Sequence, residues 1–380
     1  MRVLFLTPHY LDTAGGGTFA TLANLHAFSC VADEVTALIP YRGKASLLQM
    51  PSNVQLINVE DHRSFVRKVI SFLCGHSHRY AHVEKMVDLK LYDMVVFDTS
   101  MTSARLVKMF NSKGINTVTI HHNFQWEYIR DNVKFPLKPF ALYWCNKYEK
   151  ESVNYSQLNL TLTEEDMHLL QSHFSKRNEK FAVLGTFEYC KKTHPVTPAV
   201  KEDAFVITGS LGSVQTEESL VPWIREYYPL LKEAFPKSRL ILAGRLPSLK
   251  LCRLAKEYGI MVIPSPESMD DVLRQAKYYI CATSLGGGLK LRVMDGLKVG
   301  LPVLSHQVSA RGYGHFVGKE MLFEYHDKIS FKQSLNKLKE CTYQKSDIIK
   351  EYENVFSFES GVARLDSILN DFFPKLSKKR

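Results

Sequence analysis

Residues 286–303 read GGGLKLRVMDGLKVGLPV. They follow an apolar run at 278–282 (YYICA) that is typical of a buried strand, and they lead into a segment with helical spacing at about 289–298. Backbone N–H groups in a glycine turn before a helix bind phosphate oxygens, and Lys290 and Arg292 add two cations beside them. The pattern predicts a strand, a turn and a helix that suit a diphosphate. The turn residues expected to contact this ligand are Gly286, Gly287, Gly288 and Leu289.

The same alternation of strand and helix runs along the whole chain. Short apolar runs rich in β-branched residues recur, and longer stretches with helical spacing separate them. Continuous apolar strands that alternate with helices indicate parallel sheets covered on both faces. The expected strands are 2–7, 34–39, 54–59, 94–98, 116–120, 158–162, 181–184, 204–209, 239–243, 260–263, 278–282, 302–305 and 321–325. The predicted fold class is therefore α/β, with two doubly wound domains.

An interruption in this alternation separates the two domains. Gly185, Pro195 and Pro198 break the periodicity together with several charged residues, and a new strand begins at Ala204. The expected boundaries are 1–185 for the first domain, 186–203 for a linker and 204–355 for the second domain. A C-terminal helix at about 356–380 is expected to pack back on the first domain.

Composition excludes several classes of protein. Of the 380 residues, 45% are hydrophobic and 23% are charged, which is the composition of a folded globular protein and not of a disordered or collagen-like chain. The formal net charge of +10 favours anionic partners such as phosphates or anionic lipid. Because the positive charge is dispersed and no recognition motif is present, we expect no nucleic-acid partner.

Cysteine usage and hydropathy indicate the compartment. The seven cysteines are scattered and form no C-x-x-C pair, which favours a reducing compartment over a disulfide framework or a zinc site. The apolar run at 3–6 is too short for the core of a secretory signal, and no run of about 18 apolar residues occurs. We therefore expect a cytoplasmic protein with no membrane span.

The second half of the chain resembles the GT-B glycosyltransferases, most closely the retaining glycosyltransferase family 4. Members of this family carry a glycine turn, a helix with an acid, and then Ala-x-x-x-Gly-x-Pro-Val. A large subgroup reads like G-x-G-x-[KR]-x-[KR]-x-x-E-A, which has the spacing of 286–296. The segments 207–210 (ITGS) and 240–244 (LILAG) also follow in the family's order. The resemblance implies two Rossmann-like domains that face each other across a cleft.

The resemblance also implies an activity. A relative of this kind transfers a sugar, with retention, from a nucleoside diphosphate sugar (UDP- or GDP-linked) to the hydroxyl of a glycan or lipid-linked glycan, in surface polysaccharide or glycolipid synthesis. Lys290 and Arg292 would stabilise the leaving diphosphate, and the departing phosphate oxygen would help to take the acceptor's proton. Further donor-binding candidates are Gly209 and Ser210, together with Asp295, which is expected to bind the ribose hydroxyls.

The chain departs from the family in its acids. The family's E-x7-E pair reads Gly287 and Asp295 here, so recognition of the donor sugar must come from elsewhere. No D-x-D occurs in the chain, so we expect Lys and Arg to neutralise the phosphates, with neither a metal nor a cofactor. His76, His78 and His82 have the types and some of the spacing of metal ligands, but nothing completes the set, and a solvated helix is expected there.

The first domain contributes a glycine loop and a histidine pair. Gly16 and Gly17 lie in a loop after the first strand that resembles the family's loop near the donor phosphates, and they lack the G-x-G-x-x-G spacing of a dinucleotide site. His121 and His122 end the strand at 116–120, where the alternation of side chains predicts that only one imidazole faces the cleft. Both are candidate catalytic residues. The candidate acceptor-binding residues are Asn123 and Glu127, although Glu127 could instead cap its loop.

Two other functions and one surface remain as alternatives. The altered acid pair allows a non-catalytic GT-B partner subunit, and a nucleotide-sugar epimerase shares the fold. Between Asp131 and Glu149 there is no acid, while three lysines alternate with aromatic residues, which predicts peripheral contact with an anionic membrane at the inner face of the plasma membrane. A helix that buries these aromatics between domains, with its lysines outside, explains the pattern equally well.

Overall fold

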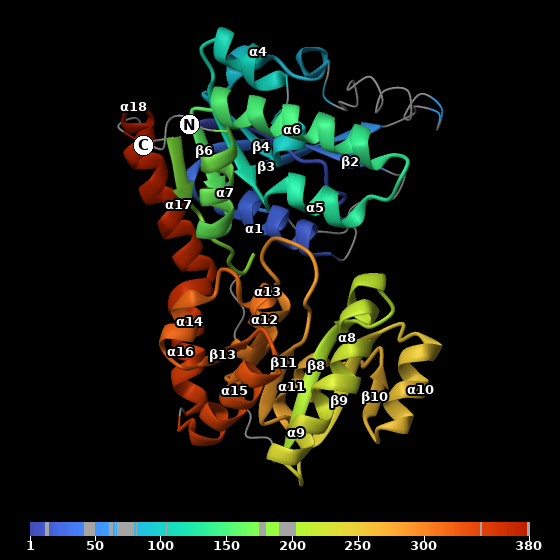
Figure 1. The fold of residues 1–380 in the computed structure, drawn as a ribbon. Coiled ribbons are helices and arrows are strands. Elements are labelled where there is room, and N and C mark those ends of the chain that lie inside the picture. Colours follow the sequence, from blue (N-terminus) through green and yellow to red (C-terminus); the bar gives the residue numbers. More distant parts are fainter. Residues whose placement is uncertain are drawn as a thin grey trace. The chain divides into compact units, whose positions relative to one another are not determined.

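The computed structural model describes residues 1–11, 15–41, 50–60, 64, 66, 80, 82–103, 105–174, 180–189, 203–342 and 344–377. The chain divides into two compact units (Figure 1). The first consists of Met1–Lys191 and Phe356–Arg380, and the second of Lys192–Val355. Each unit contains one parallel sheet with helices on its faces, as the sequence predicts.

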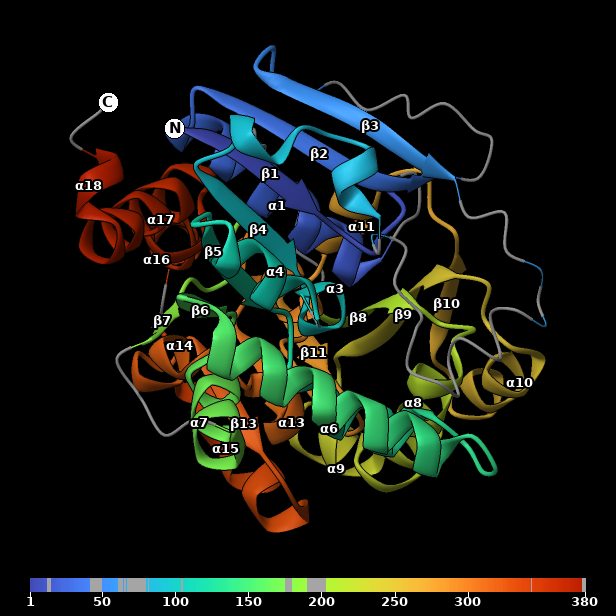
Figure 2. The same ribbon diagram turned by 90° about the horizontal axis from the view of Figure 1, so that it is seen from above.

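The first unit is built on a seven-stranded sheet in the order β3-β2-β1-β4-β5-β6-β7, in which every pair of neighbours is parallel. Figure 2 shows β3 at one edge of this sheet, followed by β2, β1 and β4. The strands are β1 (Arg2–Leu6), β2 (Glu34–Tyr41), β3 (Val54–Glu60), β4 (Met94–Asp98), β5 (Asn116–His121), β6 (Leu158–Thr161) and β7 (Phe181–Val183). All seven strands lie within two residues of the ranges expected from the sequence.

Helices cover both faces of this sheet because its apolar strands are buried on both sides. In β1, Val3 and Phe5 pack towards one face and Leu4 and Leu6 towards the other. The helical segments are α1 (Gly16–Val31), η1 (Val83–Lys85), η2 (Leu89–Leu91), α3 (Ser100–Ser103), α4 (Leu106–Ser112), α5 (Gln125–Asn132), α6 (Lys138–Tyr155), α7 (Glu164–Phe174), α17 (Phe358–Phe372) and α18 (Pro374–Ser377).

The second unit has a six-stranded parallel sheet in the order β10-β9-β8-β11-β12-β13. Its strands are β8 (Ala204–Ser210), β9 (Arg239–Arg245), β10 (Met261–Pro264), β11 (Tyr278–Cys281), β12 (Val303–His306) and β13 (Leu322–Tyr325). Its helices are α8 (Val214–Glu226), α9 (Tyr228–Ala234), α10 (Leu249–Glu257), α11 (Met269–Gln275), α12 (Arg292–Leu297), α13 (Gln307–Ala310), α14 (Gly314–Gly318), α15 (Lys328–Glu340) and α16 (Lys345–Phe356). Each sheet reverses its strand order once, between β1 and β4 in the first unit and between β8 and β11 in the second.

The C-terminal segment packs on the first unit as two helices, where the sequence analysis expected one. Ser357 caps the start of α17, and α17 lies against α1 (Figure 1). The fit is close, because a side chain at Gly361 would collide with the ring of Phe187. Arg364 of α17 also donates to the carbonyl oxygens of Leu184 (3.0 Å) and Thr186 (3.4 Å).

These contacts correct one boundary. Residues 186–189 were expected to form part of the linker, but Phe187 is fully buried and Glu188 N–H donates to the carbonyl oxygen of Phe356. Any linker therefore begins after residue 189, and the rest of the expected segment, 190–202, lies outside the described residues. None of the helices in the described ranges is both long and apolar enough to cross a lipid bilayer.

Candidate functional site

The first candidate site lies where β8 ends, beside the reversal of strand order in the second unit, which is where open α/β sheets bind ligands. Two glycines allow the strand ends to approach closely. Gly209 and Gly244 have φ values of 137° and 159°, and a side chain at Gly244 would lie 1.8 Å from the Gly209 carbonyl oxygen. The guanidinium of Arg292 lies over Gly209, since a Cβ at that position would be 2.5 Å from Cζ of Arg292. Because Gly209 has no side chain, the guanidinium of Arg292 can lie against the end of β8.

Hydrogen bonds hold both cations predicted from the sequence, Arg292 beside this strand end and Lys290 in the glycine turn after β11. Nη2 of Arg292 donates to Oγ1 of Thr216 at 2.9 Å. Nζ of Lys290 donates to the carbonyl oxygen of Gly287 at 2.9 Å, within the glycine turn itself. The backbone of Lys290 is fixed as well, because its carbonyl oxygen accepts from the buried hydroxyl of Tyr313. Both cations are thus positioned by the protein and remain partly exposed.

The turn differs from the prediction in one respect. Helix α12 begins at Arg292, and the sequence predicted a start at about 289. Gly286 and Gly288 have φ values of 81° and 71°, so the chain makes a turn that only glycine adopts readily, and Leu289 lies between this turn and the helix. The glycine amides therefore do not form the first turn of α12. The glycines instead allow the chain to turn so that the side chain of Lys290 reaches the carbonyl oxygen of Gly287.

Asp295 lies in the first turn of α12 with part of its carboxylate exposed. Oδ2 accepts from Oγ1 of Thr208 at 3.1 Å, and Oδ1 lies 3.4 Å from Nζ of Lys298. Burial raises its pKa, while Lys298 and Thr208 act in the opposite direction. With 33% of the side chain exposed, the carboxylate has room for further donors. Ser210, the last residue of β8, is half-buried, and its carbonyl oxygen accepts from the amide of Ser213.

The second candidate site lies in the first unit, where β1, β4 and β5 end side by side. Asp98, the last residue of β4, is fully buried. Its carboxylate accepts hydrogen bonds from the hydroxyls of Thr7 (2.6 Å) and Thr21, and Oδ1 lies 2.6 Å from Nε2 of His122. Burial acts to raise the pKa of Asp98, but the charge and hydrogen bond of His122, followed by those of His9, hold it well below its ordinary value. The carboxylate is therefore ionised.

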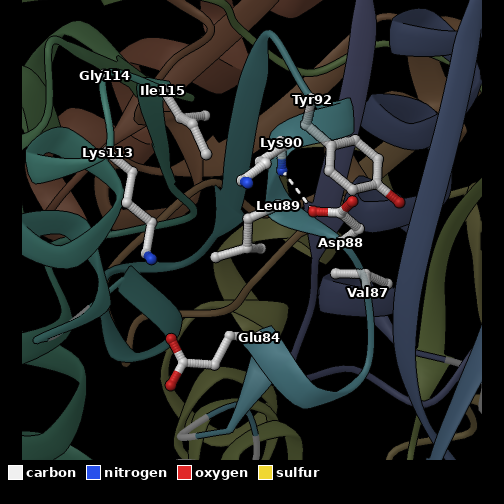
Figure 3. A pocket seen from close by; sticks show the side chains of 9 residues that line it. All are labelled: Glu84, Val87, Asp88, Leu89, Lys90, Tyr92, Lys113, Gly114 and Ile115. Carbon is white, nitrogen blue, oxygen red and sulfur yellow. Dashed lines mark hydrogen bonds between the residues drawn. The ribbon is translucent and has the colours of Figure 1, made fainter.

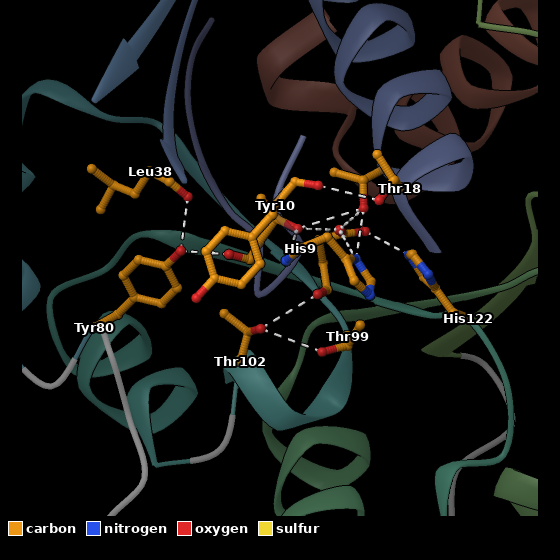
Figure 4. Close-up of polar contacts among 11 residues, drawn as sticks. His9, Tyr10, Thr18, Leu38, Tyr80, Thr99, Thr102 and His122 are labelled. Atoms are coloured by element: carbon orange, nitrogen blue, oxygen red, sulfur yellow. Dashed lines mark hydrogen bonds and ion pairs between the residues drawn. The ribbon is translucent and has the colours of Figure 1, made fainter. Parts of the chain in front are cut away.

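A second imidazole, that of His9, completes this cluster (Figure 4). Nδ1 of His9 lies 2.9 Å from Oγ1 of Thr21 and 3.5 Å from Oδ2 of Asp98. The rings of His9 and His122 stack with their centroids 5.3 Å apart. Gly17, in the first turn of α1, makes room for the His9 ring, because a Cβ there would lie 2.7 Å from Nε2. Gly16 is the first residue of that helix.

Sequence reasoning missed both Asp98 and His9. Asp98 was assigned to the end of a strand without a role, and His9 was not considered. The signal that was available is positional: both residues follow or end apolar strands, at the edge where parallel sheets place functional groups. A further sign is visible only in the structure. Thr99, which follows Asp98, has a φ of 103°, and a strained non-glycine residue of this kind often marks a functional site.

The structure separates the two neighbouring histidines and corrects the assignment of His121 as a catalytic residue. His121 is buried, and its Nε2 pairs with Oδ1 of Asn159 at 3.0 Å. Burial lowers its pKa to about 4, so the ring is neutral near pH 7. Because successive side chains of a strand point to opposite faces, only His122 reaches the Asp98 cluster.

Two buried carboxylates fasten the loop that follows His122. Oδ1 of Asp166 accepts from the amide of Phe124 at 2.9 Å. The two oxygens of Glu149, on α6, accept from the amides of Gln125 (2.8 Å) and Trp126 (3.1 Å) at the start of α5. Asp166 lies in the first turn of α7, and its Oδ2 also accepts from the hydroxyl of Thr163 at 2.8 Å. Burial raises the pKa of Glu149 to about 8.

The two acceptor candidates lie on or beside this loop. Asn123 precedes the fastened amides, and its buried Oδ1 has no hydrogen-bond partner among the described residues. Glu127 lies in the first turn of α5 and pairs with Arg130 at 3.3 Å. The loop thus brings Asn123 next to His122, whereas Glu127 is already engaged with a cation of its own helix.

One further pocket lies in the first unit, at the amino ends of β4 and β5. It has a volume of about 590 Å³, and Figure 3 shows the side chains around it. It is lined by Glu84, Val87, Asp88, Leu89, Lys90, Tyr92, Lys113, Gly114 and Ile115. These residues precede β4 and β5, so the pocket is at the amino ends of strands whose carboxyl ends carry Asp98 and His122. It includes none of the residues singled out from the sequence.

No group of three His, Cys, Asp or Glu side chains suitable for a metal ion occurs in the part of the chain that the structure describes. Of the three histidines weighed as metal ligands, His82 is exposed and precedes η1. His76 and His78 lie outside the described residues.

Comparison with solved structures identifies the fold. No protein-family model and no curated protein sequence matches the chain. Among solved structures, sucrose-phosphate synthase from Thermosynechococcus elongatus matches with a TM-score of 0.69 and 12% identity, over 98% of this chain and 99% of that one. HepE from Anabaena, in complex with UDP, matches with a TM-score of 0.65 and 13% identity, over 98% and 100% of the two chains. The lipopolysaccharide outer core galactosyltransferase WaaB matches with a TM-score of 0.63 and 12% identity, over 99% and 100%.

These matches span both units of the chain and nearly the whole of each matched protein. At such low identity they establish the architecture. The chain has the GT-B fold that these glycosyltransferases share, as the sequence resemblance predicted.

Proposed function

We propose that the chain is a glycosyltransferase that uses a nucleoside diphosphate sugar as its donor. The observation that carries the proposal is the placement of Arg292 across Gly209, with Lys290 bonded to the glycine turn, at the reversal of strand order in the second unit. Two fixed cations at that position suit a diphosphate, whose charge grows as the sugar leaves. Two structural neighbours support the choice of donor, since HepE and a mutant of TarM from S. aureus were each solved with UDP.

Asp295 supplies a second part of the donor site. Its carboxylate is held by Thr208 and Lys298, and its exposed part can accept hydrogen bonds from vicinal hydroxyls such as those of a ribose. Gly287 stands where the family has its first acid, so other groups must recognise the donor sugar. The backbone amides of Gly287 and Gly288, in the same turn, are the groups we propose. We propose that the donor is linked to UDP or GDP, and that Lys290 and Arg292 bind its phosphates without a metal or cofactor.

The sequence resemblance supports the finer assignment. It favours transfer with retention to a hydroxyl of a glycan or lipid-linked glycan, in surface polysaccharide or glycolipid synthesis. The imidazole of His122 and the loop with Asn123 stand in the first unit, at the edge where the resemblance places the acceptor side. Among the neighbours, WaaB is described as a lipopolysaccharide outer core galactosyltransferase and WaaG as a glycosyltransferase involved in lipopolysaccharide biosynthesis.

An exposed surface on α6 and the loop before it supports contact with an anionic membrane on the cytoplasmic side. Phe135, Phe140 and Tyr143 are 83%, 50% and 62% exposed, and Lys134 is exposed beside them. The opposite side of α6, which includes Cys145, is buried against the first unit. Exposed aromatics next to lysines suit a lipid interface, where each lysine near anionic lipid contributes about 1 kcal/mol. The alternative remains that the helix buries these aromatics between the domains, with its lysines outside.

A ligand screen followed by product analysis tests the proposal. Ligand at 100 times its Kd adds about 2.7 kcal/mol to the free energy of unfolding, so UDP-, GDP- and CMP-sugars can be ranked by thermal shift. The donor that binds is then incubated with hydroxyl acceptors, and NMR of the product gives the configuration of the new bond. Transfer with retention is expected. Binding without turnover would favour a partner subunit, and conversion of the donor without an acceptor would favour an epimerase.

A further inference from the structure

A buried chain of hydroxyl groups in the second unit ends at the carboxylate of Asp295. The hydroxyl of Tyr279, on β11, lies 2.7 Å from Oγ1 of Thr208, near the end of the neighbouring strand β8. Oγ1 of Thr208 donates in turn to Oδ2 of Asp295 at 3.1 Å. Tyr279 and Thr208 are both buried, so their hydroxyls depend on partners within the protein. Two strands of the sheet therefore reach the carboxylate through two hydroxyls.

The protons available to these groups determine the direction of each hydrogen bond. Thr208 has one hydroxyl proton and donates it to the carboxylate of Asp295. The oxygen of Thr208 must then accept the proton of Tyr279. Burial, followed by the nearby charge of Asp295, raises the pKa of Tyr279 well above its ordinary value, so the phenol keeps that proton. The hydrogen bonds thus run from Tyr279 through Thr208 to Asp295 and hold the threonine hydroxyl in one orientation.

The anchored carboxylate retains two positions that can accept hydrogen bonds. Oδ2 of Asp295 accepts from Thr208, and Oδ1 lies 3.4 Å from Nζ of Lys298. Each carboxylate oxygen has two lone-pair sites, so one site remains on each oxygen. The side chain is 33% exposed, and these sites can accept from two vicinal hydroxyls of a ligand. Because both oxygens of Asp295 have a partner, the carboxylate is oriented before a ligand binds.

Gly296 allows the ring of Tyr279 to lie against helix α12. Glycine inside a helix is less favourable than alanine, so its place there needs a reason. A Cβ at position 296 would lie 2.6 Å from Cγ of Tyr279, which is too close for the two to coexist. The family that the chain resembles has Glu-Ala where this chain has Asp295 and Gly296. The shorter acid is thus accompanied by a glycine that admits the ring whose hydroxyl holds Thr208.

We propose that Thr208 and Tyr279 are positioning residues that orient the carboxylate of Asp295 for the vicinal hydroxyls of a ribose, so that the site selects a ribonucleoside diphosphate over its deoxy analogues. The inference rests on the proposed glycosyltransferase function and deepens it, because it assigns selectivity for the ribose to named side chains. Thr208 acts through Asp295, and Tyr279 acts through Thr208. Gly296 provides the room that the tyrosine ring requires.

Titration calorimetry of the full-length protein measures this selectivity. The ligands are UDP or GDP, whichever base the ligand screen selects, and the 2′-deoxy and 3′-deoxy analogues of that nucleotide. The wild type should bind each analogue about 10- to 100-fold more weakly, because each analogue lacks one hydrogen bond to a charged group. Thr208→Val keeps the shape of the side chain and removes its hydroxyl, so the ratio of the two Kd values should fall to about threefold or less. Thr208→Ser restores the hydroxyl and should keep the wild-type ratio.

Two further variants separate a positioning role from a structural one. Tyr279→Phe keeps the ring and should reduce the Kd ratio by a smaller factor than Thr208→Val. The double variant should have the same ratio as Thr208→Val alone, because Tyr279 acts only through Thr208. Ser334→Ala is the matched control for the loss of a buried hydroxyl in the same unit. Ser334, on α15, donates to the carbonyl oxygen of Glu324 at 2.6 Å, so its replacement should lower the free energy of unfolding and leave the Kd ratio unchanged.

The outcomes distinguish the inference from the proposed function. If the wild type binds the nucleoside diphosphate and its deoxy analogues equally well, the inference is wrong and the transferase proposal stands. A folded Thr208→Val variant with the wild-type ratio also overturns the inference. If Thr208→Val does not fold, Tyr279→Phe decides, since a reduced ratio supports the inference and an unchanged ratio overturns it. If the wild type binds neither UDP nor GDP, the proposed function fails, and the inference fails with it.

Discussion

Nε2 of His122 lies 2.6 Å from Oδ1 of Asp98, and the two residues stand at the ends of neighbouring parallel strands. The bond joins two positions 24 residues apart in the chain and places an ionised, fully buried carboxylate beneath a partly exposed imidazole. The hydroxyls of Thr7 and Thr21 complete the shell of the carboxylate. Asp98 therefore contributes both to the stability of the first unit and to the orientation of His122.

Replacing Asp98 with Asn should destabilise the protein. The amide cannot accept from all of the donors that face the carboxylate, and breaking a buried pair costs about 3–5 kcal/mol. Because the folded-state pKa of Asp98 lies below its unfolded value, its stabilisation is present above about pH 4 and is lost as the pH falls further. In urea unfolding at pH 7, the free energy of unfolding of Asp98→Asn should be much lower than that of the wild type. At pH 3.5 the difference between the two should be smaller.

The control is Asp93→Asn. Asp93 directly precedes β4, and its carboxylate accepts an exposed hydrogen bond from the backbone amide of Arg2 at 2.8 Å. It should change the free energy of unfolding much less. Equal stability of Asp98→Asn and the wild type at pH 7 would contradict the assignment of Asp98 as the acceptor of these hydrogen bonds.

Removing either cation from the second unit should weaken nucleotide binding. Lys290→Ala or Arg292→Ala removes one charge-assisted contact to phosphate, which corresponds to about 1.5–3 kcal/mol in binding free energy. Titration calorimetry with the nucleoside diphosphate measures the change. Lys277→Ala is the control, because Lys277 lies just before β11, at the opposite edge of the sheet. Unchanged affinity in both folded variants would place the diphosphate elsewhere.

Chelation of metal ions should leave transfer unaffected. The proposal assigns neutralisation of the phosphates to Lys290 and Arg292, and the chain contains no D-x-D. Initial rates measured with and without EDTA should agree within error. Loss of activity in EDTA, with recovery on addition of Mn²⁺ or Mg²⁺, would show that the two cations do not carry this role alone.

Charge reversal on the exposed surface of α6 and the loop before it should weaken binding to lipid. The wild type is expected to sediment with vesicles that contain anionic lipid at low salt, and less so as salt screens the lysines. Lys134→Glu combined with Lys138→Glu should reduce the bound fraction. The matched control, Lys237→Glu with Lys256→Glu, changes the net charge equally at exposed positions of the second unit. Absence of wild-type binding at low salt would rule out membrane contact and leave the transferase proposal intact.

Because of Glu149, the free energy of unfolding should fall as the pH rises. Its folded-state pKa, about 8, is above the unfolded value, so the folded state binds the extra proton between about pH 5 and pH 8. The corresponding stability is fully present below that range and declines by as much as about 1.4 kcal/mol per pH unit within it. Glu149→Gln should remove this slope in urea unfolding at pH 5, 6, 7 and 8. Parallel profiles for variant and wild type would show that Glu149 does not titrate in this range.

The strands and the second-unit cations could be predicted because their signals are local. A strand buried on both faces must be a short apolar run, and each of the expected runs became a strand. The predicted glycine turn between a strand and a helix is present, and Gly286 and Gly288 adopt positive φ in it. The start of α12 was predicted three residues too early, because Lys290 and Leu291 also have helical spacing and only their contacts show where the helix begins.

His121 and His122 show what the alternation of side chains along a strand can and cannot predict. Alternation along a strand predicted that His121 and His122 would face different surroundings, and it could not tell which partner each of them would have. His121 bonds to Asn159 and His122 to Asp98, and both partners come from neighbouring strands. The pairing of strands, with its register, therefore decided the roles of two residues that are adjacent in the sequence.

The sequence by itself determined the α/β class, the positions of the strands and the glycine turn with its two cations, because each depends on residues within about twenty positions of one another. Only the tertiary structure brought Asp98 to Thr7, Thr21, His9 and His122, since Thr21 and Asp98 are 77 residues apart. No local pattern encodes such a contact. It arises because parallel β-strands align their carboxyl ends at one edge, and the order of strands in the sheet, β1 beside β4 beside β5, selects which ends meet.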